Sequence, residues 1–186
     1  MNISISRFFQ TAFALVGLIA VSCTHGNRNQ SDVFTAPQVE YSQDSVAPAV
    51  IQDFSLPSSS GETLSIANEV AKHKLTIIDF WASWCGPCMK EMPMMKNLYD
   101  TYKKQGLGIV GISLDTEKDK WLTALQTMGM SWTNLSDMKG WESDIARFYE
   151  VSSIPYTMVV DSNGTIVAGG LRGESLRLYI EKHINK

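Results

Sequence analysis

Residues 75–88 read LTIIDFWASWCGPC and join an apolar run to a pair of cysteines. The run over residues 75–80 is continuous and rich in β-branched residues, which is typical of a strand buried on both faces of a parallel sheet. From Cys88 onward, apolar residues recur every three or four positions, which predicts a helix that ends near Gly106. The sequence therefore predicts a buried strand that stops just before a helix, with Cys85 and Cys88 at the junction.

This position determines the chemistry expected of the cysteine pair. Unpaired backbone N–H groups and the helix dipole favour negative charge at a helix N-terminus, so we expect a lowered pKa for Cys85. Cys88 lies one turn further on, and we expect its thiol to be more buried and less acidic. Cys85 can then attack the disulfide of a partner, and Cys88 can resolve the mixed disulfide. Gly86 permits another backbone to approach closely, and Pro87 suits the first helical turn.

A zinc site and a structural disulfide are the alternative explanations for a Cys-x-x-Cys motif. A structural zinc ion needs four ligands, yet the chain has no second cysteine pair and its three histidines have no paired ligand spacing. The position at a strand-to-helix junction favours a redox-active disulfide over a structural one. We therefore expect no metal and no cofactor other than the Cys85–Cys88 pair itself.

Two carboxylates lie at spacings that allow them to serve Cys88 as a base. Asp79 lies six residues before Cys85 at the end of the apolar strand, where an unpaired acid is costly to bury. Glu91 lies three residues after Cys88, on the neighbouring helical face. The alternative is that Glu91 is a solvated acid in the first helical turn, where its negative charge interacts favourably with the helix dipole.

The chain around this junction, from residue 48 to residue 186, has the pattern of one α/β domain. Short β-like runs at 50–56 and 62–66 predict an N-terminal hairpin, and Asn163-Gly164 predicts a second hairpin near the C-terminus. Further strands and helices alternate as in βαβ units. The expected strands are 107–114, 132–135, 156–160 and 165–168, and the expected helices are 117–128, 143–149 and 174–184.

Composition and charge exclude several classes of protein. The 186 residues are 44% hydrophobic and 19% charged, which is too apolar for a disordered polypeptide. The formal net charge of −3 argues against nucleic acid as the main partner. Three cysteines are too few for a disulfide scaffold, and the odd number leaves Cys23 to be explained separately. The sequence leaves open whether Trp121, Trp132 and Trp141 belong to the core or to a docking surface.

The N-terminal segment predicts export. Arg7 precedes a mostly apolar stretch over residues 8–21, which is shorter than the about 20 residues of a membrane-spanning helix. The basic start, the apolar centre and the small residues Ala20 and Ser22 predict a signal peptide covering residues 1–22. The mature protein is then expected to work outside the cytoplasm.

Residues 18–23, LIAVSC, resemble the lipobox of bacterial lipoproteins, in which a peptidase cuts before a cysteine that carries diacylglycerol on its sulfur. Ala20 stands where that motif most often has Leu, and cleavage at the same bond by the ordinary signal peptidase is the alternative. We expect a lipid anchor on Cys23 and a polar tether over residues 23–47, with a reach of about 25 to 30 Å. The expected location is the periplasmic side of the cell envelope, anchored to a membrane.

Residues 79–88, DFWASWCGPC, resemble the active-site segment of thioredoxins. The export signal, the N-terminal hairpin, the run CMKEMP at 88–93 and an extra βα segment at 118–135 are similar to the exported TlpA/ResA-like thioredoxin family. The resemblance extends over residues 48–186. It implies a thioredoxin fold, with a central mixed sheet flanked by helices, an N-terminal β-hairpin and an inserted βα segment, and it implies thiol-disulfide exchange.

The resemblance also implies roles for residues outside the cysteine pair. It makes Pro155 a cis-proline that faces the cysteines. Tyr156 stands where family members usually have Thr, which affects substrate preference more than chemistry. The residues expected to contact substrate are Trp84, Gly86, Pro87, Ile154 and Pro155.

The same resemblance implies roles for the two acids Asp79 and Glu91. Asp79 matches the buried acid of cytoplasmic thioredoxins. In the TlpA/ResA-like proteins, a Glu at the position of Glu91 is associated with proton transfer. Asp79 and Glu91 are therefore expected to be catalytic together with Cys85 and Cys88.

These features predict an envelope thiol-disulfide oxidoreductase. Gly-Pro between the cysteines resembles thioredoxin, whose reduction potential is about −270 mV, and this favours a reductant of exported proteins, as in cytochrome c maturation or thiol rescue. A reductant in an oxidising compartment must be recharged, which implies a membrane partner that transfers thiol reducing power. The alternatives are a disulfide oxidase or isomerase, or a binding lipoprotein on an inert thioredoxin fold. A peroxiredoxin-type peroxidase is disfavoured because Ala82 stands where its motif needs Thr.

Overall fold

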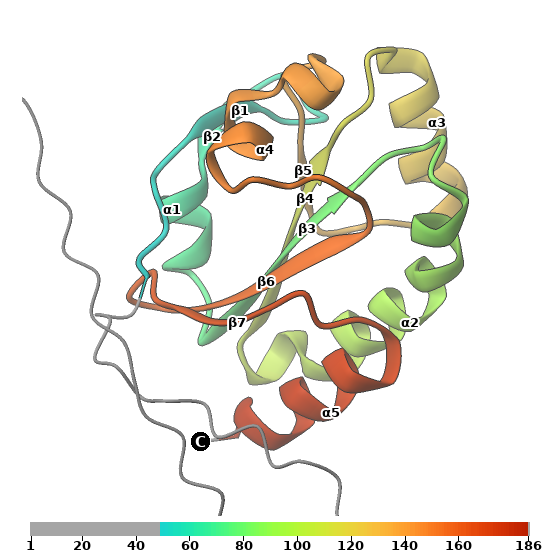
Figure 1. The fold of residues 1–186 in the computed structure, drawn as a ribbon. Helices are drawn as coiled ribbons and strands as arrows, with labels where there is room; N and C mark the ends of the chain where they lie inside the picture. Colours follow the sequence, from blue (N-terminus) through green and yellow to red (C-terminus); the bar gives the residue numbers. More distant parts are fainter. Residues whose placement is uncertain (1–48, 186) are drawn as a thin grey trace, which may run out of the picture. The chain divides into compact units, whose positions relative to one another are not determined.

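The computed structural model describes residues 49–185. The expected signal peptide, the tether and Cys23 lie outside the described residues. Within them, helices and strands alternate along the chain in the order that the sequence pattern predicts, with one short helix added near the start (Figure 1).

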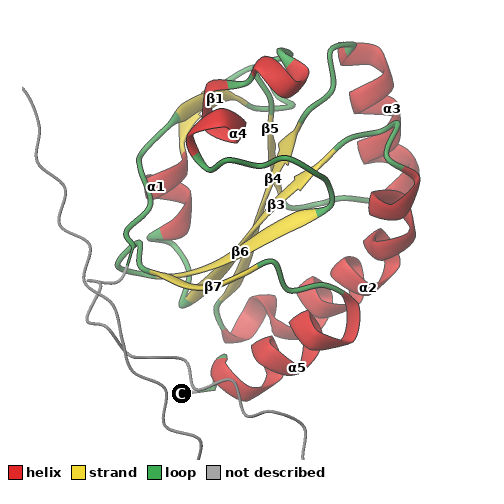
Figure 2. Ribbon diagram, viewed as in Figure 1, coloured by secondary structure: helices red, strands yellow, loops and turns green. Residues whose placement is uncertain are grey.

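A five-stranded sheet forms the centre of the domain, with strand order β5-β4-β3-β6-β7. Strands β3, β4 and β5 are parallel, whereas β6 runs antiparallel to β3 and β7 antiparallel to β6. The predicted mixed sheet is therefore confirmed (Figure 2). The strand bounds are Leu75–Trp81 for β3, Leu107–Ser113 for β4, Thr133–Leu135 for β5, Tyr156–Asp161 for β6 and Ile166–Gly169 for β7.

Strands β3 and β4 lie at the core of the sheet, and every residue of both is buried. Their parallel register pairs Ile77 with Ile109 and Phe80 with Ile112. Because helices cover both faces of the sheet, both sets of alternating side chains need to be apolar, and this is what the continuous apolar runs of the sequence supply. The strand predicted before the cysteine pair is therefore confirmed.

Within residues 49–185, five α-helices flank the sheet, with α2, α3 and α5 on one face and α1 and α4 on the other (Figures 1 and 2). Pro87 stands in the first turn of α2, where its missing N–H leaves no helical hydrogen bond unmade. Gly106, with φ of +105°, ends the 3-10 turn that follows α2. The helix bounds are Ile66–Val70 for α1, Gly86–Tyr102 for α2, Lys118–Met128 for α3, Asp144–Phe148 for α4 and Gly173–His183 for α5.

The N-terminal hairpin forms a separate two-stranded sheet of β1 (Ser55–Pro57) and β2 (Thr63–Ser65). Its register pairs Leu56 with Leu64, and a bridge from Ser58 to Leu135 joins it to the edge of the main sheet. The predicted hairpin is present, but its strands are shorter than the runs 50–56 and 62–66.

Helix α1 follows the hairpin at once and was not predicted. Ser65 caps it, because its Oγ accepts a hydrogen bond of 3.1 Å from the N–H of Asn68. Asp53 accepts further hydrogen bonds from the hydroxyl of Ser65 and the N–H of Ala67. Because of these side-chain bonds, Ile66 belongs to the helix and not to the predicted strand. The helix was missed because five residues are too few to show an apolar period.

Candidate active site

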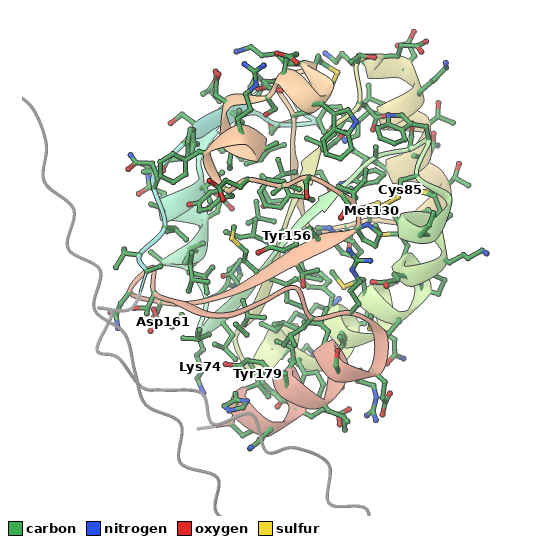
Figure 3. The ribbon with its side chains drawn as sticks, in the orientation of Figure 1. Lys74, Cys85, Met130, Tyr156, Asp161 and Tyr179 are labelled. Carbon is green, nitrogen blue, oxygen red and sulfur yellow. A yellow bond between two sulfur atoms is a disulfide. The ribbon has the colours of Figure 1, made fainter. Side chains whose placement is uncertain are left out.

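Cys85 and Cys88 lie where the sequence places them, at the start of α2. Figure 3 labels Cys85. Their sulfurs form a disulfide, and their Cα atoms are 5.2 Å apart. Cys85 is the N-cap residue, and the N–H of Cys88 donates a hydrogen bond of 3.1 Å to Cys85 Sγ. The Cys85 side chain keeps 5% exposure and Cys88 keeps none. The geometry therefore gives one sulfur that a partner can reach, with a backbone donor directed at it.

Three residues next to Cys85 in the chain are exposed. Trp84 is 55% exposed, and Gly86 and Pro87 are exposed as well. A side chain added at Gly86 would meet no atom within 4 Å, so the space beside this backbone is open. The environment of Gly86 thus has room for the close approach that the sequence predicts.

The turn between β3 and Cys85 is held by Asp115, which the sequence analysis missed. The Asp115 carboxylate is buried and accepts hydrogen bonds of 3.0 Å from the Ser83 N–H and 2.5 Å from the Ser83 hydroxyl. The Ser113 hydroxyl donates a third bond of 2.7 Å. A signal was available, because Asp115 follows the strand parallel to β3, and the carboxyl ends of parallel strands meet at one edge of a sheet.

The bond between Ile154 and Pro155 is cis, as the resemblance implies. Pro155 is buried and directly precedes β6, whose first residue, Tyr156, pairs with Phe80 of β3 (Figure 3). Because β3 ends one residue after Phe80, Pro155 lies at the sheet edge from which the chain turns toward Cys85. The structure therefore brings the cis-proline segment and the cysteine turn to the same edge.

Asp79 is buried in β3, and its Oδ2 has no hydrogen-bond partner. Burial raises the pKa of this carboxyl to about 7, and the negative charge of Glu91 adds to the rise. A carboxyl whose pKa lies near neutral pH can both accept and release a proton under working conditions. Asp79 thus has the electrostatic properties of a general base beside the helix that carries Cys88.

Glu91 is half-buried in the second turn of α2, since that helix begins at Gly86. The alternative of a solvated first-turn acid is therefore wrong. Burial raises the pKa of Glu91, while the charge of Arg172 and the N–H of Gly173 oppose the rise. Both opposing groups lie at the start of α5, and no local sequence pattern connects them to Glu91. Glu91 lies close enough to Asp79 for its negative charge to raise the pKa of the Asp79 carboxyl.

The sequence did not decide whether Trp121, Trp132 and Trp141 are buried or exposed, and the structure divides them into two groups. Trp121 and Trp132 are buried in the core, whereas Trp141 is 43% exposed. The ring of Trp141 lies 6.3 Å from the ring of Trp84, centre to centre. Trp84 also lines a groove of about 490 Å³ between the start of α2 and α3.

No group of three or more His, Cys, Asp or Glu side chains within residues 49–185 is arranged to hold a metal ion. None of the helices in that part of the chain is long and apolar enough to cross a membrane. The described residues form a disulfide at the N-terminus of α2, and the preceding strand β3 and α2 itself each carry an acid whose pKa is raised by burial.

The chain resembles thiol-disulfide oxidoreductases of known sequence and structure. A family model described as thioredoxin-like matches residues 73–166. The chain is 27% identical over 175 residues to the thiol-disulfide oxidoreductase ResA of Geobacillus kaustophilus, a match that covers 92% of each chain. A solved thiol-disulfide oxidoreductase from Bacteroides fragilis is 32% identical, with a TM-score of 0.68 over 72% of this chain and 98% of that one. The solved thioredoxin domain of such an enzyme from Bacteroides vulgatus is 30% identical, with a TM-score of 0.68 over 76% of this chain and all of that domain.

Proposed function

The chain belongs to the thioredoxin-like family and is a thiol-disulfide oxidoreductase, and we propose that it reduces disulfides of exported proteins through a dithiol-disulfide cycle of Cys85 and Cys88. The predicted thioredoxin fold is confirmed by the solved relatives. The observation that carries the proposal is the position of Cys85 Sγ, which caps α2 and accepts a hydrogen bond from the N–H of Cys88. That position stabilises a thiolate, the reactive form of the residue.

The cycle begins with both cysteines reduced. The Cys85 thiolate attacks one sulfur of a substrate disulfide, so that a mixed disulfide forms and the other substrate sulfur leaves as a thiolate that takes up a proton. Cys88 then loses its proton and attacks Cys85 Sγ, which releases the second substrate sulfur and closes the Cys85–Cys88 disulfide. Two electrons pass from the enzyme dithiol to the substrate disulfide.

The second attack needs a base, because Cys88 is fully buried and burial disfavours its thiolate. Asp79 takes the proton from Cys88 in this proposal, supported by its burial and its pKa of about 7. Glu91, half-buried and closer to the surface, relays the proton between Asp79 and solvent. The electrostatic coupling between the two acids supports their acting as a pair.

Substrate contacts are assigned to the two segments that meet at the sheet edge. The exposed residues Trp84, Gly86 and Pro87 border Cys85 on the helix side. Ile154 and Pro155 lie on the β6 side, where the backbone of an extended substrate segment can pair with them. The substrate is therefore held on both sides of the reacting sulfur.

The cellular setting rests on the N-terminal sequence. Residues 1–22 act as an export signal, Cys23 carries the lipid, and residues 23–47 tether the domain on the periplasmic side of a membrane. A membrane partner returns electrons to the Cys85–Cys88 disulfide after each cycle. Mass spectrometry of the mature N-terminus tests the anchor, because an acylated Cys23 supports it and an unmodified Cys23 contradicts it.

Reduction of a protein disulfide tests the function. The reduced protein is mixed with insulin, and the loss of the insulin disulfides is followed with dithiothreitol as the electron source. We expect catalysis by the wild type, none by Cys85→Ser, and an accumulated mixed disulfide through Cys85 in Cys88→Ser. A wild type that fails to accelerate the reaction contradicts the reductase proposal, and faster oxidation of reduced peptides supports the oxidase alternative.

A further inference from the structure

Two exposed tryptophans lie side by side next to the reactive disulfide. Trp84 and Trp141 are 55% and 43% exposed, and their rings are tilted by 55° with centres 6.3 Å apart. A single exposed apolar residue is common, but a pair of exposed Trp side chains beside a reactive group is typical of an interaction surface. Trp84 is part of the cysteine motif itself, whereas Trp141 comes from a segment 57 positions later in the chain.

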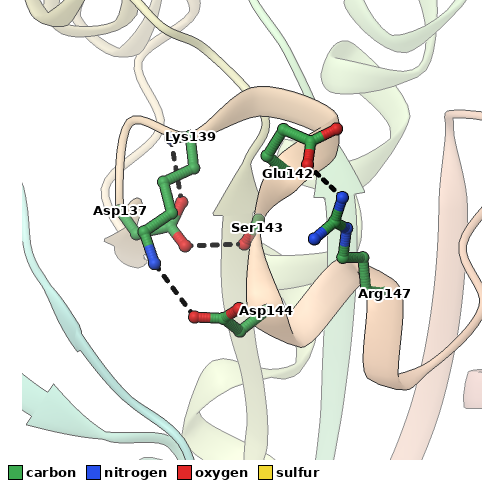
Figure 4. A network of polar contacts seen from close by, with 6 residues as sticks. All are labelled: Asp137, Lys139, Glu142, Ser143, Asp144 and Arg147. Carbon is green, nitrogen blue, oxygen red and sulfur yellow. Dashed lines mark hydrogen bonds and ion pairs between the residues drawn. The ribbon is translucent and has the colours of Figure 1, made fainter.

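The segment that carries Trp141 is braced by polar contacts rather than left as a free loop (Figure 4). Asp137 accepts hydrogen bonds from the Lys139 N–H at 3.1 Å and from the Ser143 hydroxyl at 2.9 Å. Lys139 pairs with Asp144, and Arg147 pairs with Glu142. Trp141 therefore stands on a turn whose conformation is set before any partner arrives, which lowers the entropy lost on binding.

The turn also depends on Gly140, directly before Trp141. Gly140 has φ of +58° and is buried, and a Cβ there would lie 3.0 Å from Cγ2 of Thr116. The positive φ therefore favours glycine here, and an added Cβ would also have to displace the Thr116 methyl group by a few tenths of an ångström. The conformation of Gly140 thus sets the backbone from which the exposed Trp141 side chain projects.

Trp84 connects this aromatic pair to the groove between α2 and α3. The groove has a volume of about 490 Å³, and Trp84 shares its lining with Met89 of α2 and with Thr123 and Ala124 of α3. The strip from Trp141 across Trp84 into the groove is therefore continuous, and it borders Cys85 on one side. We call these residues the tryptophan strip.

Most charges around the strip are paired with one another, and the exception in the lining of the groove is Asp119. Lys139 binds Asp144, Arg147 binds Glu142, and at the groove Lys120 binds Glu117. Paired surface charges attract a charged partner only weakly. Apart from Asp119, recognition at the strip therefore depends on apolar contact.

We propose that the tryptophan strip is a docking surface that selects substrate segments carrying an aromatic or large aliphatic side chain next to the reacting cysteine. The inference rests on the proposed function, because the strip matters only where a polypeptide meets Cys85. Cys85 keeps just 5% exposure, so a substrate sulfur that reaches it brings its flanking residues into contact with Trp84. Trp141 then adds a second aromatic wall, which a small disulfide is too short to touch.

Single-turnover reduction of matched peptides tests the proposal. Two peptides carry the same disulfide with 2-mercaptoethanol and differ only in whether Phe or Ser flanks the cysteine, and hydroxyethyl disulfide is the small substrate. We expect the wild type to reduce the Phe peptide about 10-fold faster than the Ser peptide, because the Phe side chain is removed from water when it packs against the two Trp rings. Trp141→Ala should remove this preference and leave the rates with the Ser peptide and hydroxyethyl disulfide within about 2-fold.

Two further variants separate docking from structure. Trp141→Phe should retain most of the preference because it keeps an aromatic wall, and Leu178→Ala, which removes another exposed apolar side chain from α5, should leave it unchanged. Equal rates for both peptides in the wild type overturn the proposal, as does an equal loss with all three substrates in Trp141→Ala. Self-association that Trp141→Ala abolishes also overturns it, in favour of a second copy of the chain as the occupant.

The same experiment distinguishes a failure of the docking proposal from a failure of the reductase proposal. A wild type that reduces all three substrates without preference contradicts the strip and leaves the reductase proposal standing. A wild type that reduces none of them contradicts the reductase. In that case the oxidised enzyme is mixed with the two thiol peptides, because the sulfurs meet in the same geometry in both directions, and the same preference is expected.

Discussion

Asp79 is the residue whose environment departs most from that of an ordinary surface acid. It is buried in a central strand with an unpaired oxygen, and its pKa is raised to about 7. Glu91 contributes to that rise through its negative charge. A variant that removes the charge of Glu91 is therefore expected to change the titration of Asp79.

Resolution of the mixed disulfide should depend on pH through this pair. The wild-type rate is expected to rise through pH about 7 as Asp79 loses its proton. Glu91→Gln should slow resolution on the order of 10-fold, less than the about 10²- to 10⁴-fold of a sole general base. It should also move the inflection to lower pH, because the charge that raises the pKa of Asp79 is gone. Stopped-flow measurement of the two half-reactions checks this.

The attack of Cys85 on substrate is the internal control for these variants and should be much less affected. Asp79→Asn on the Glu91→Gln background should add less than its separate effect, because both acids serve one thiol. If Glu91→Gln leaves resolution unchanged at every pH while Asp79→Asn abolishes it, the role of Glu91 is lost.

The buried charge of Asp79 should also lower stability at neutral pH. The folded protein holds the Asp79 proton up to pH about 7, whereas the unfolded chain releases it near the ordinary value of 3.8. The free energy of unfolding therefore falls as the pH rises from about 4 to about 7 and is then level with respect to this group.

Asp79→Asn removes this loss, so the oxidised variant should be more stable than the wild type at pH 8, on the order of 2 to 4 kcal/mol. At pH 4 the two proteins should differ far less. Urea unfolding at the two pH values measures the difference. If the difference in free energy of unfolding between the variant and the wild type is the same at pH 8 as at pH 4, the burial of Asp79 carries no such penalty.

The connection from β3 to α2 holds the reactive sulfur, and its conformation depends on a neighbouring strand. Asp115, just after β4, accepts three hydrogen bonds, two of them from Ser83. Breaking these hydrogen bonds would leave buried polar groups without partners, which is costly. The Asp115 carboxylate therefore holds the turn between β3 and Cys85 in one conformation.

Asp115→Ala should destabilise the oxidised protein by about 2 to 4 kcal/mol, because it leaves buried donors on Ser83 and Ser113 without a partner. It should also slow the attack of Cys85, since the turn that positions the sulfur loosens. Urea unfolding and single-turnover reduction of hydroxyethyl disulfide measure the two effects. Glu62→Ala removes an exposed acid as the control, and a loss no larger than that of this control would contradict the bracing role.

Elements with a strong local signal could be predicted from the sequence, and elements that depend on distant partners could not. The strands β3 and β4 and the Asn163-Gly164 turn are all present, because a continuous apolar run and a pair of turn-forming residues can be recognised within a short stretch of sequence. Helix α1 could not be predicted, because its five residues are too few to show an apolar period and part of its stabilisation comes from the distant Asp53. The same holds within the site for Arg172, whose effect on Glu91 arises only when α5 packs beside α2.

The fold as a whole brings three distant segments to one edge of the sheet. The cysteine turn follows β3, Asp115 follows β4, and Pro155 precedes β6. Parallel pairing of β3 with β4 and antiparallel pairing of β3 with β6 make this meeting unavoidable. The sequence could predict the cysteine pair from its motif, whereas the exposure of Trp141 required the packing of the complete domain.

The reduction potential of the Cys85–Cys88 pair distinguishes a reductase from an oxidase. The protein is equilibrated in thiol-disulfide buffers of defined potential, and the reduced fraction is measured by alkylation of free thiols and mass spectrometry. A reductase with Gly-Pro between its cysteines should have a potential near that of thioredoxin, about −270 mV. A potential near about −120 mV, that of a strongly oxidising enzyme, would contradict the proposed direction of electron flow.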